Sequence, residues 1–170
     1  MLRLKRTALA LLLLSGPLMS ASAAGPPPPE AIAPPPGETI VLSVHAEGAQ
    51  VYECKAGADG KLGWVVREPI ATLLADGKTV GRHYAGPNWE HSDGSAVVGK
   101  VTASVPGATS NDIPWQKLEV ISRRGSGILT GVTTVQRINT KGGKLEGACD
   151  KAGAYRNVPY SAEYIFLRKA

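Results

Sequence analysis

The chain has 170 residues, with 19 Lys and Arg against 14 Asp and Glu and a formal net charge of +5. Three of the positive charges (Arg3, Lys5 and Arg6) fall in the first 24 residues, which contain no acidic residue. Residues 25–170 therefore carry a net charge of only +2. Because binding to phosphate backbones needs a clustered excess of positive charge on the folded part, this balance excludes nucleic acid as an expected partner.

The first 24 residues have the order of a secretory signal peptide. The positively charged start is followed by an apolar run over Ala8–Leu14, then Pro17, then small residues at 21–24 that suit cleavage. The alternative is an uncleaved membrane anchor, but the apolar run is shorter than the roughly 20 residues that a spanning helix needs. We expect no transmembrane segment and export to the periplasm or the extracellular space.

Residues 25–38 form a proline-rich linker, with seven of the thirteen prolines of the chain. Such a run favours extended polyproline II structure and cannot enter the interior of a sheet. The remaining residues, 39–170, suit a single domain.

From Glu38 onward apolar residues alternate with polar ones, which is the period of β-strands. The runs that show this pattern are 38–45, 49–55, 63–67, 79–84, 95–105, 115–123, 132–139 and 160–167. Glycine-containing turns separate most of them. We predict an all-β fold, a sandwich or partly closed barrel of about eight to ten short strands. Single helical turns are expected only at Pro69–Ala75 and Asp150–Ala154.

Two cysteines, Cys54 and Cys149, remain after the leader. In an oxidising compartment an even number of cysteines predicts a disulfide, here one that closes a long loop. The alternative is a pair of buried free thiols.

The segment Gly81–Ser95 has the densest set of reactive side chains. For ligand binding the candidates are His83, Tyr84, Trp89 and Glu90, and for a divalent metal they are His83, His91 and Asp93. Imidazole and carboxylate groups suit both metal binding and acid–base chemistry. The alternative is structural, with packed aromatic rings and solvated acids. No cofactor is predicted beyond that possible metal.

The three tryptophans differ in context. Trp64 and Trp115 lie within strand-like runs and are expected in the core. Trp89 follows Gly86-Pro87-Asn88 and is expected in an exposed loop, where a flat ring suits a sugar or another ligand.

An ordered set of motifs resembles an exported family of bacteria and fungi that is catalogued as domain of unknown function 3455. The motifs are Val51-Tyr52-Glu53-Cys54, Val80 to Glu90 with Asp93-Gly94-Ser95, Ile113-Pro114-Trp115, Val135 to Gly143, and Val158 to Tyr164. The resemblance covers about residues 38–168. It implies export and the β fold, and it implies no catalytic residue.

No catalytic signature such as a P-loop or G-x-S-x-G is present. The sequence therefore favours a non-enzymatic extracytoplasmic binding or envelope-associated domain, with a small molecule, a glycan or an envelope component as partner. The alternative is a small metal-dependent or acid–base enzyme that uses His83, Glu90, His91 and Asp93. A purely structural role is a third hypothesis, and it predicts no pocket near Trp89.

Overall fold

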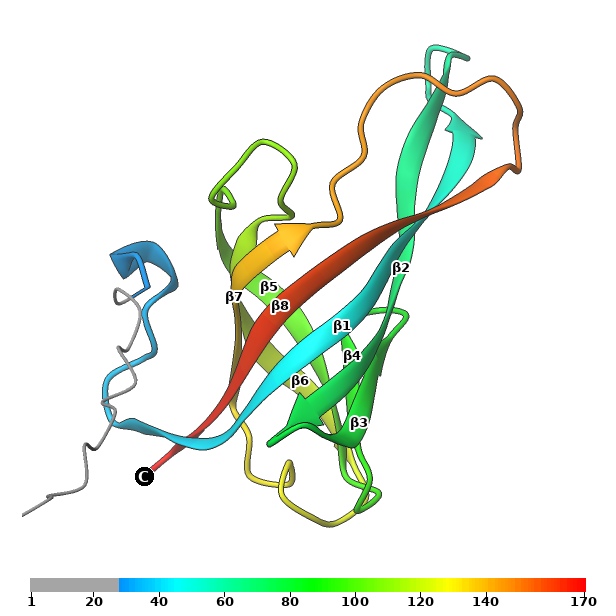
Figure 1. The fold of residues 1–170 in the computed structure, drawn as a ribbon. Coiled ribbons are helices and arrows are strands. Elements are labelled where there is room, and N and C mark those ends of the chain that lie inside the picture. The colour runs from blue at the N-terminus through cyan, green and yellow to red at the C-terminus, as the bar shows by residue number, and fades with distance from the viewer. Residues whose placement is uncertain (1–27) are drawn as a thin grey trace, which may run out of the picture.

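The computed structural model describes residues 28–170, which form one closed β-barrel (Figure 1). The elements are a 3-10 turn η1 (Glu30–Ile32) and the strands β1 (Glu38–Ala56), β2 (Leu62–Ala75), β3 (Lys78–Tyr84), β4 (Asn88–His91), β5 (Ala96–Val105), β6 (Trp115–Arg124), β7 (Thr134–Gly142) and β8 (Tyr155–Lys169). Every strand is antiparallel to the next one in the chain, and β8 pairs with β1 to close the ring. The predicted signal peptide lies outside the described residues.

The all-β prediction is confirmed, and the sheet closes fully rather than forming a sandwich. Three strands are much longer than expected, since β1, β2 and β8 have 19, 14 and 15 residues. The helical turn predicted at Pro69–Ala75 is wrong, because these residues lie in β2. The one predicted at Asp150–Ala154 is also wrong, because these residues form bends and a turn.

Every second side chain along the strands points inward, and these side chains fill the barrel. Val44 and Ala46 of β1 point inward, as do Ala71 and Leu73 of β2, and all four are buried. The largest fully buried side chains of this core are aromatic and come from β4 and β8, namely Trp89, Tyr164 and Phe166. The interior around these rings is therefore packed with side chains.

The long strands project beyond one end of the barrel as a three-stranded ribbon of β8, β1 and β2 (Figure 1). Residues 143–154, which we call the strap, connect β7 to the tip of this ribbon. The strap hydrogen-bonds to the free edge of β2, where Trp64 N donates to Gly147 O at 3.2 Å. The predicted disulfide is confirmed: Cys54 of β1 bonds to Cys149 of the strap, with their Cα atoms 5.9 Å apart.

Part of the expected linker packs on the outside of the barrel. Ile32 is fully buried, and Gln136 Nε2 donates to its carbonyl oxygen at 2.6 Å. Lys117 Nζ donates to Ala33 O at 3.3 Å. Within residues 28–170 no helix has the length and apolar character needed to cross a membrane.

Candidate functional site

His83 and Trp89 lie inside the barrel. They are register partners on β3 and β4, and their exposed fractions are 2% and 1%. Their rings stack with centroids 4.6 Å apart, and Tyr164 packs edge-on against both. The expectation that Trp89 lies in an exposed loop is wrong, because the Gly-Pro turn ends before it and β4 points its ring into the core. Neither ring offers a surface to a ligand outside the barrel.

The protonation of His83 follows from its surroundings. Its Nδ1 lies 2.8 Å from the carbonyl oxygen of Asn88. Because a carbonyl only accepts, Nδ1 must carry the proton and Nε2 is the unprotonated nitrogen. Burial lowers the pKa of His83 to about 3, so the ring is neutral at physiological pH.

Tyr84 and Glu90 lie on the outer face of the same strands. Glu90 accepts hydrogen bonds from Arg82 and Arg124 and from the Tyr84 hydroxyl, the last at 3.1 Å. Arg124 and Arg82 together hold the pKa of Glu90 down at about 2. A carboxylate with these partners is a poor base, and this cluster links β3, β4 and β6 across the surface.

His91 and Asp93 lie at the end of β4, where Nδ1 of His91 is 3.1 Å from Oδ2 of Asp93. Asp93 also accepts from the backbone and hydroxyl of Ser95 and from Ile128 N, and these contacts hold its pKa well below the usual range. This carboxylate ties the β4–β5 turn to the β6–β7 connection. In the described part of the chain no three His, Cys, Asp or Glu side chains are grouped closely enough to hold a metal ion, so His83 does not complete a site with this pair.

A second pair of a histidine and a carboxylate forms where β1 meets β8 and closes the barrel. His45 of β1 and Glu163 of β8 are register partners, with Nδ1 and Oε1 2.7 Å apart, and this contact raises the pKa of His45. The pair faces a hollow of about 720 Å³ that Trp115 and Lys141 also line. The two residues are far apart in the chain, so only the closure of the barrel reveals the pair.

A hollow at the ribbon end of the barrel is lined by aromatic, apolar and charged side chains together, and we call it the mouth pocket. Its volume is about 450 Å³, and its lining includes Tyr52, Trp64, Val66, Arg137, Lys144 and Leu145. The inward face of β1 continues into it, since Tyr52 follows Val44 and Ala46 at even spacing. Val66 and Trp64 of β2 are the register partners of Tyr52 and Cys54, so they share that face.

The strap forms the outer wall of the mouth pocket, and Tyr52 holds it in place. The Tyr52 hydroxyl donates to Gly143 O at 2.7 Å and accepts from Leu145 N at 3.1 Å. The disulfide fixes the far part of the strap to the same strand. The wall is therefore attached to β1 at both ends.

Trp64 belongs to this pocket and not to the core. It is half-buried, and the guanidinium of Arg156 lies over its ring in a cation–π contact, 5.4 Å from the ring centroid. The expectation that Trp64 is a core residue is therefore wrong. The sequence around a tryptophan in a strand does not show whether its ring lies in the core or at the surface.

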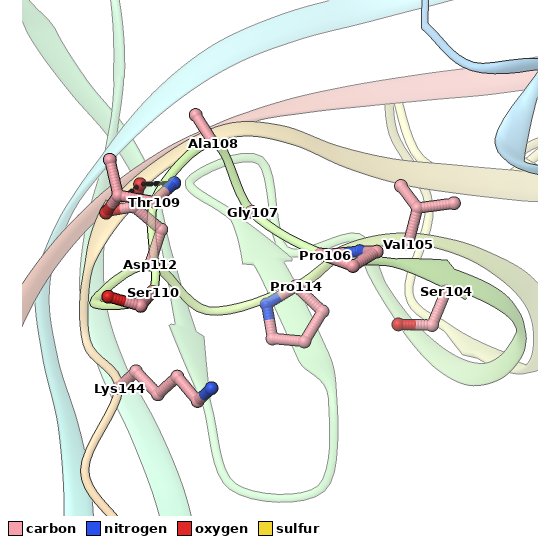
Figure 2. Close-up of a pocket in the computed structure, with 10 residues that line it drawn as sticks. All are labelled: Ser104, Val105, Pro106, Gly107, Ala108, Thr109, Ser110, Asp112, Pro114 and Lys144. Carbon is pink, nitrogen blue, oxygen red and sulfur yellow. Dashed lines mark hydrogen bonds between the residues drawn. The ribbon is translucent and has the colours of Figure 1, made fainter.

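A neighbouring hollow of about 520 Å³ shares Pro114 and Lys144 with the mouth pocket (Figure 2). Figure 2 shows the Lys144 side chain running from the strap toward Pro114, below the loop at residues 104–110. The Asp112 carboxylate here accepts from the Thr109 backbone and hydroxyl and from Gly142 N, so its oxygens are engaged within the fold. Small loop residues form most of the remaining wall, so few charged side chains line this hollow.

A protein-family profile described as "Protein of unknown function (DUF3455)" matches residues 35–168. Comparison with curated proteins and with solved structures gave no match. The profile covers the barrel, the ribbon and the strap, including both cysteines and Arg137. The chain therefore belongs to the DUF3455 family of proteins of unknown function.

Proposed function

We propose that this protein is an exported, non-enzymatic binding domain that takes a small organic molecule in the mouth pocket. The observation that carries the proposal is that Trp64, Val66 and Leu145 meet in one hollow at the open end of a closed barrel. A volume of about 450 Å³ falls in the range of small-molecule sites. The mouths of β-barrels are among the places where ligand pockets preferentially occur.

Other features of the pocket support binding over catalysis. Apolar surface that remains exposed in a concave site favours association with an apolar group, and Val66 is 53% exposed. The alternative enzyme would use His83, Glu90, His91 and Asp93, but His83 lies in the core while the two carboxylates are held by several donors each. The export signal expected in residues 1–24 and the disulfide suit a periplasmic or extracellular site of action.

The proposal is tested with 1-N-phenylnaphthylamine, a neutral apolar probe whose fluorescence rises when it leaves water. We expect saturable binding with energy transfer from tryptophan, and about tenfold weaker binding in Trp64→Ala. Tyr155→Ala is the matched control, because Tyr155 is 56% exposed on the opposite face of the same ribbon. Equal weakening in both variants, or no binding to the wild type, would refute the proposal.

A further inference from the structure

Arg137 of β7 lines the mouth pocket and is the register partner of the core residue Tyr164 of β8. It is half-buried on β7, and its Nε and Nη2 both donate to Pro114 O, at 3.0 and 2.8 Å. Within residues 28–170 no carboxylate lies within ion-pairing distance of it, whereas Lys144 of the same pocket pairs with Glu146 at 3.2 Å. A partly desolvated guanidinium without a counter-charge favours an incoming anion.

Two tyrosine hydroxyls lie behind the pocket wall. Tyr160 and Tyr164 are 4% and 0% exposed, and their hydroxyl oxygens are buried. Tyr160 sits beside Gly143, together with Gln50, which lines the mouth pocket. Burial raises the pKa of Tyr164, and the neighbouring Arg137 and Tyr160 act on it as well, so the two hydroxyls lie close to each other and to Arg137 in the interior.

Arg137 connects the pocket to these hydroxyls. It lines the mouth pocket, and its charge is close enough to lower the pKa of both Tyr160 and Tyr164, which burial otherwise raises. No hydrogen bond within the described part of the chain uses its Nη1. The arrangement offers one charged donor, Arg137, at the inner end of the pocket, with Trp64, Val66 and Leu145 at the outer end.

We propose that the ligand of the mouth pocket is an amphiphile with a carboxylate group, which binds Arg137 while its apolar part lies against Trp64. This inference rests on the binding function proposed above and adds the chemical class of the ligand. Carboxylates suit guanidinium donors, and hydrogen bonds to a charged acceptor are stronger than neutral ones.

The test displaces bound 1-N-phenylnaphthylamine with octanoate or with octanol, which share a chain length and differ in charge. At pH 7 we expect octanoate to displace half of the bound probe at a concentration about tenfold lower than octanol does. In Arg137→Gln this preference should fall to within about twofold. The matched control is Arg123→Gln, since Arg123 Nε and Nη2 donate to Val132 O in the same way but outside the mouth pocket.

The outcomes separate the two proposals. Equal displacement by octanoate and octanol would overturn the carboxylate inference while leaving the binding function standing. A probe that does not bind the wild type refutes the binding function itself. Should Arg137→Gln fail to fold, octylamine, which is positively charged at pH 7, decides on the wild type: displacement weaker than that by octanol supports the inference, and displacement at the octanoate concentration overturns it.

Discussion

His83 and Trp89 stack face to face in the core of the barrel, with their ring planes only 5° from parallel. The pair joins β3 to β4, which is the shortest strand of the barrel, with 4 residues. Large stacked rings compensate for the few ladder hydrogen bonds that so short a strand can make. The polar ring in this pair also makes the stability of the core depend on pH.

The barrel should lose stability as the pH falls from 6.5 to 5. The pKa of His83 is about 3 in the fold and near 6.5 when unfolded, so in this range the unfolded chain binds a proton that the folded chain does not. The loss from His83 should be about 1.5 kcal/mol, measured by urea unfolding at several pH values. The carboxylates with lowered pKa values titrate below this range when unfolded.

His83→Phe is the comparison for this prediction, because it keeps a flat ring against Trp89 and cannot titrate. The variant should be less stable at pH 7 by about 1 kcal/mol, since the hydrogen bond to Asn88 O is lost. His45 has a raised pKa and so acts in the opposite sense, but it is present in both proteins. A wild type and a variant with the same pH dependence would contradict the prediction.

Removal of the disulfide should weaken the whole domain. The Cys54–Cys149 bond closes a loop of 95 residues and fixes the strap to β1. The double variant Cys54→Ser, Cys149→Ser should lose about 2–4 kcal/mol of unfolding free energy in denaturant titration. The wild type in reductant should behave in the same way, and an unchanged midpoint in both would contradict the assignment.

The fold was predictable from the sequence because period-two alternation and turn residues are local signals. Strand type, approximate strand number and the disulfide follow from them. Closure into a barrel rests on the pairing of β1 with β8, which joins residues more than a hundred positions apart. Local spacing carries no information about such a pairing, so the sequence alone does not distinguish a sandwich from a barrel.

The candidate site was harder to predict, because a β-bulge decides which face of the sheet Trp64 occupies. In the β1–β2 register Val51 pairs with Glu68 and Tyr52 with Val66, which leaves Arg67 without a partner. Strict alternation from Leu73 would place Val65 inside and Trp64 outside. The extra residue reverses this and points Trp64 into the mouth pocket. The sequence does not indicate a binding role for Arg137, because a single arginine in a strand is common.

Glu90 should titrate near pH 2, far below an ordinary glutamate, because Arg124 and Arg82 both donate to it. NMR titration of its carboxyl carbon measures this pKa directly. Arg124→Gln should raise the value, while Arg82 continues to hold it below 4.5. Arg123→Gln, a neighbour that donates to Val132 O, should leave it unchanged. A wild-type value near 4.5 would show that the cluster does not persist in solution.

Gly48→Ala should strongly destabilise the barrel, because backbone atoms of β2 occupy the space that a Cβ at this position needs. A Cβ atom at Gly48 would lie 2.0 Å from Ile70 O and 2.6 Å from Ala71 Cα, which are backbone atoms. Neither can move without breaking the ladder between the two strands, so we expect a loss of about 3 kcal/mol or failure to fold. Gly63→Ala is the matched control on the same ribbon, since its nearest atom, Gly147 O, would lie 3.6 Å away. That variant should be neutral or slightly more stable. Equal denaturation midpoints for the two variants would contradict the close approach at Gly48, and with it the strand register that brings Tyr52 and Trp64 into one pocket.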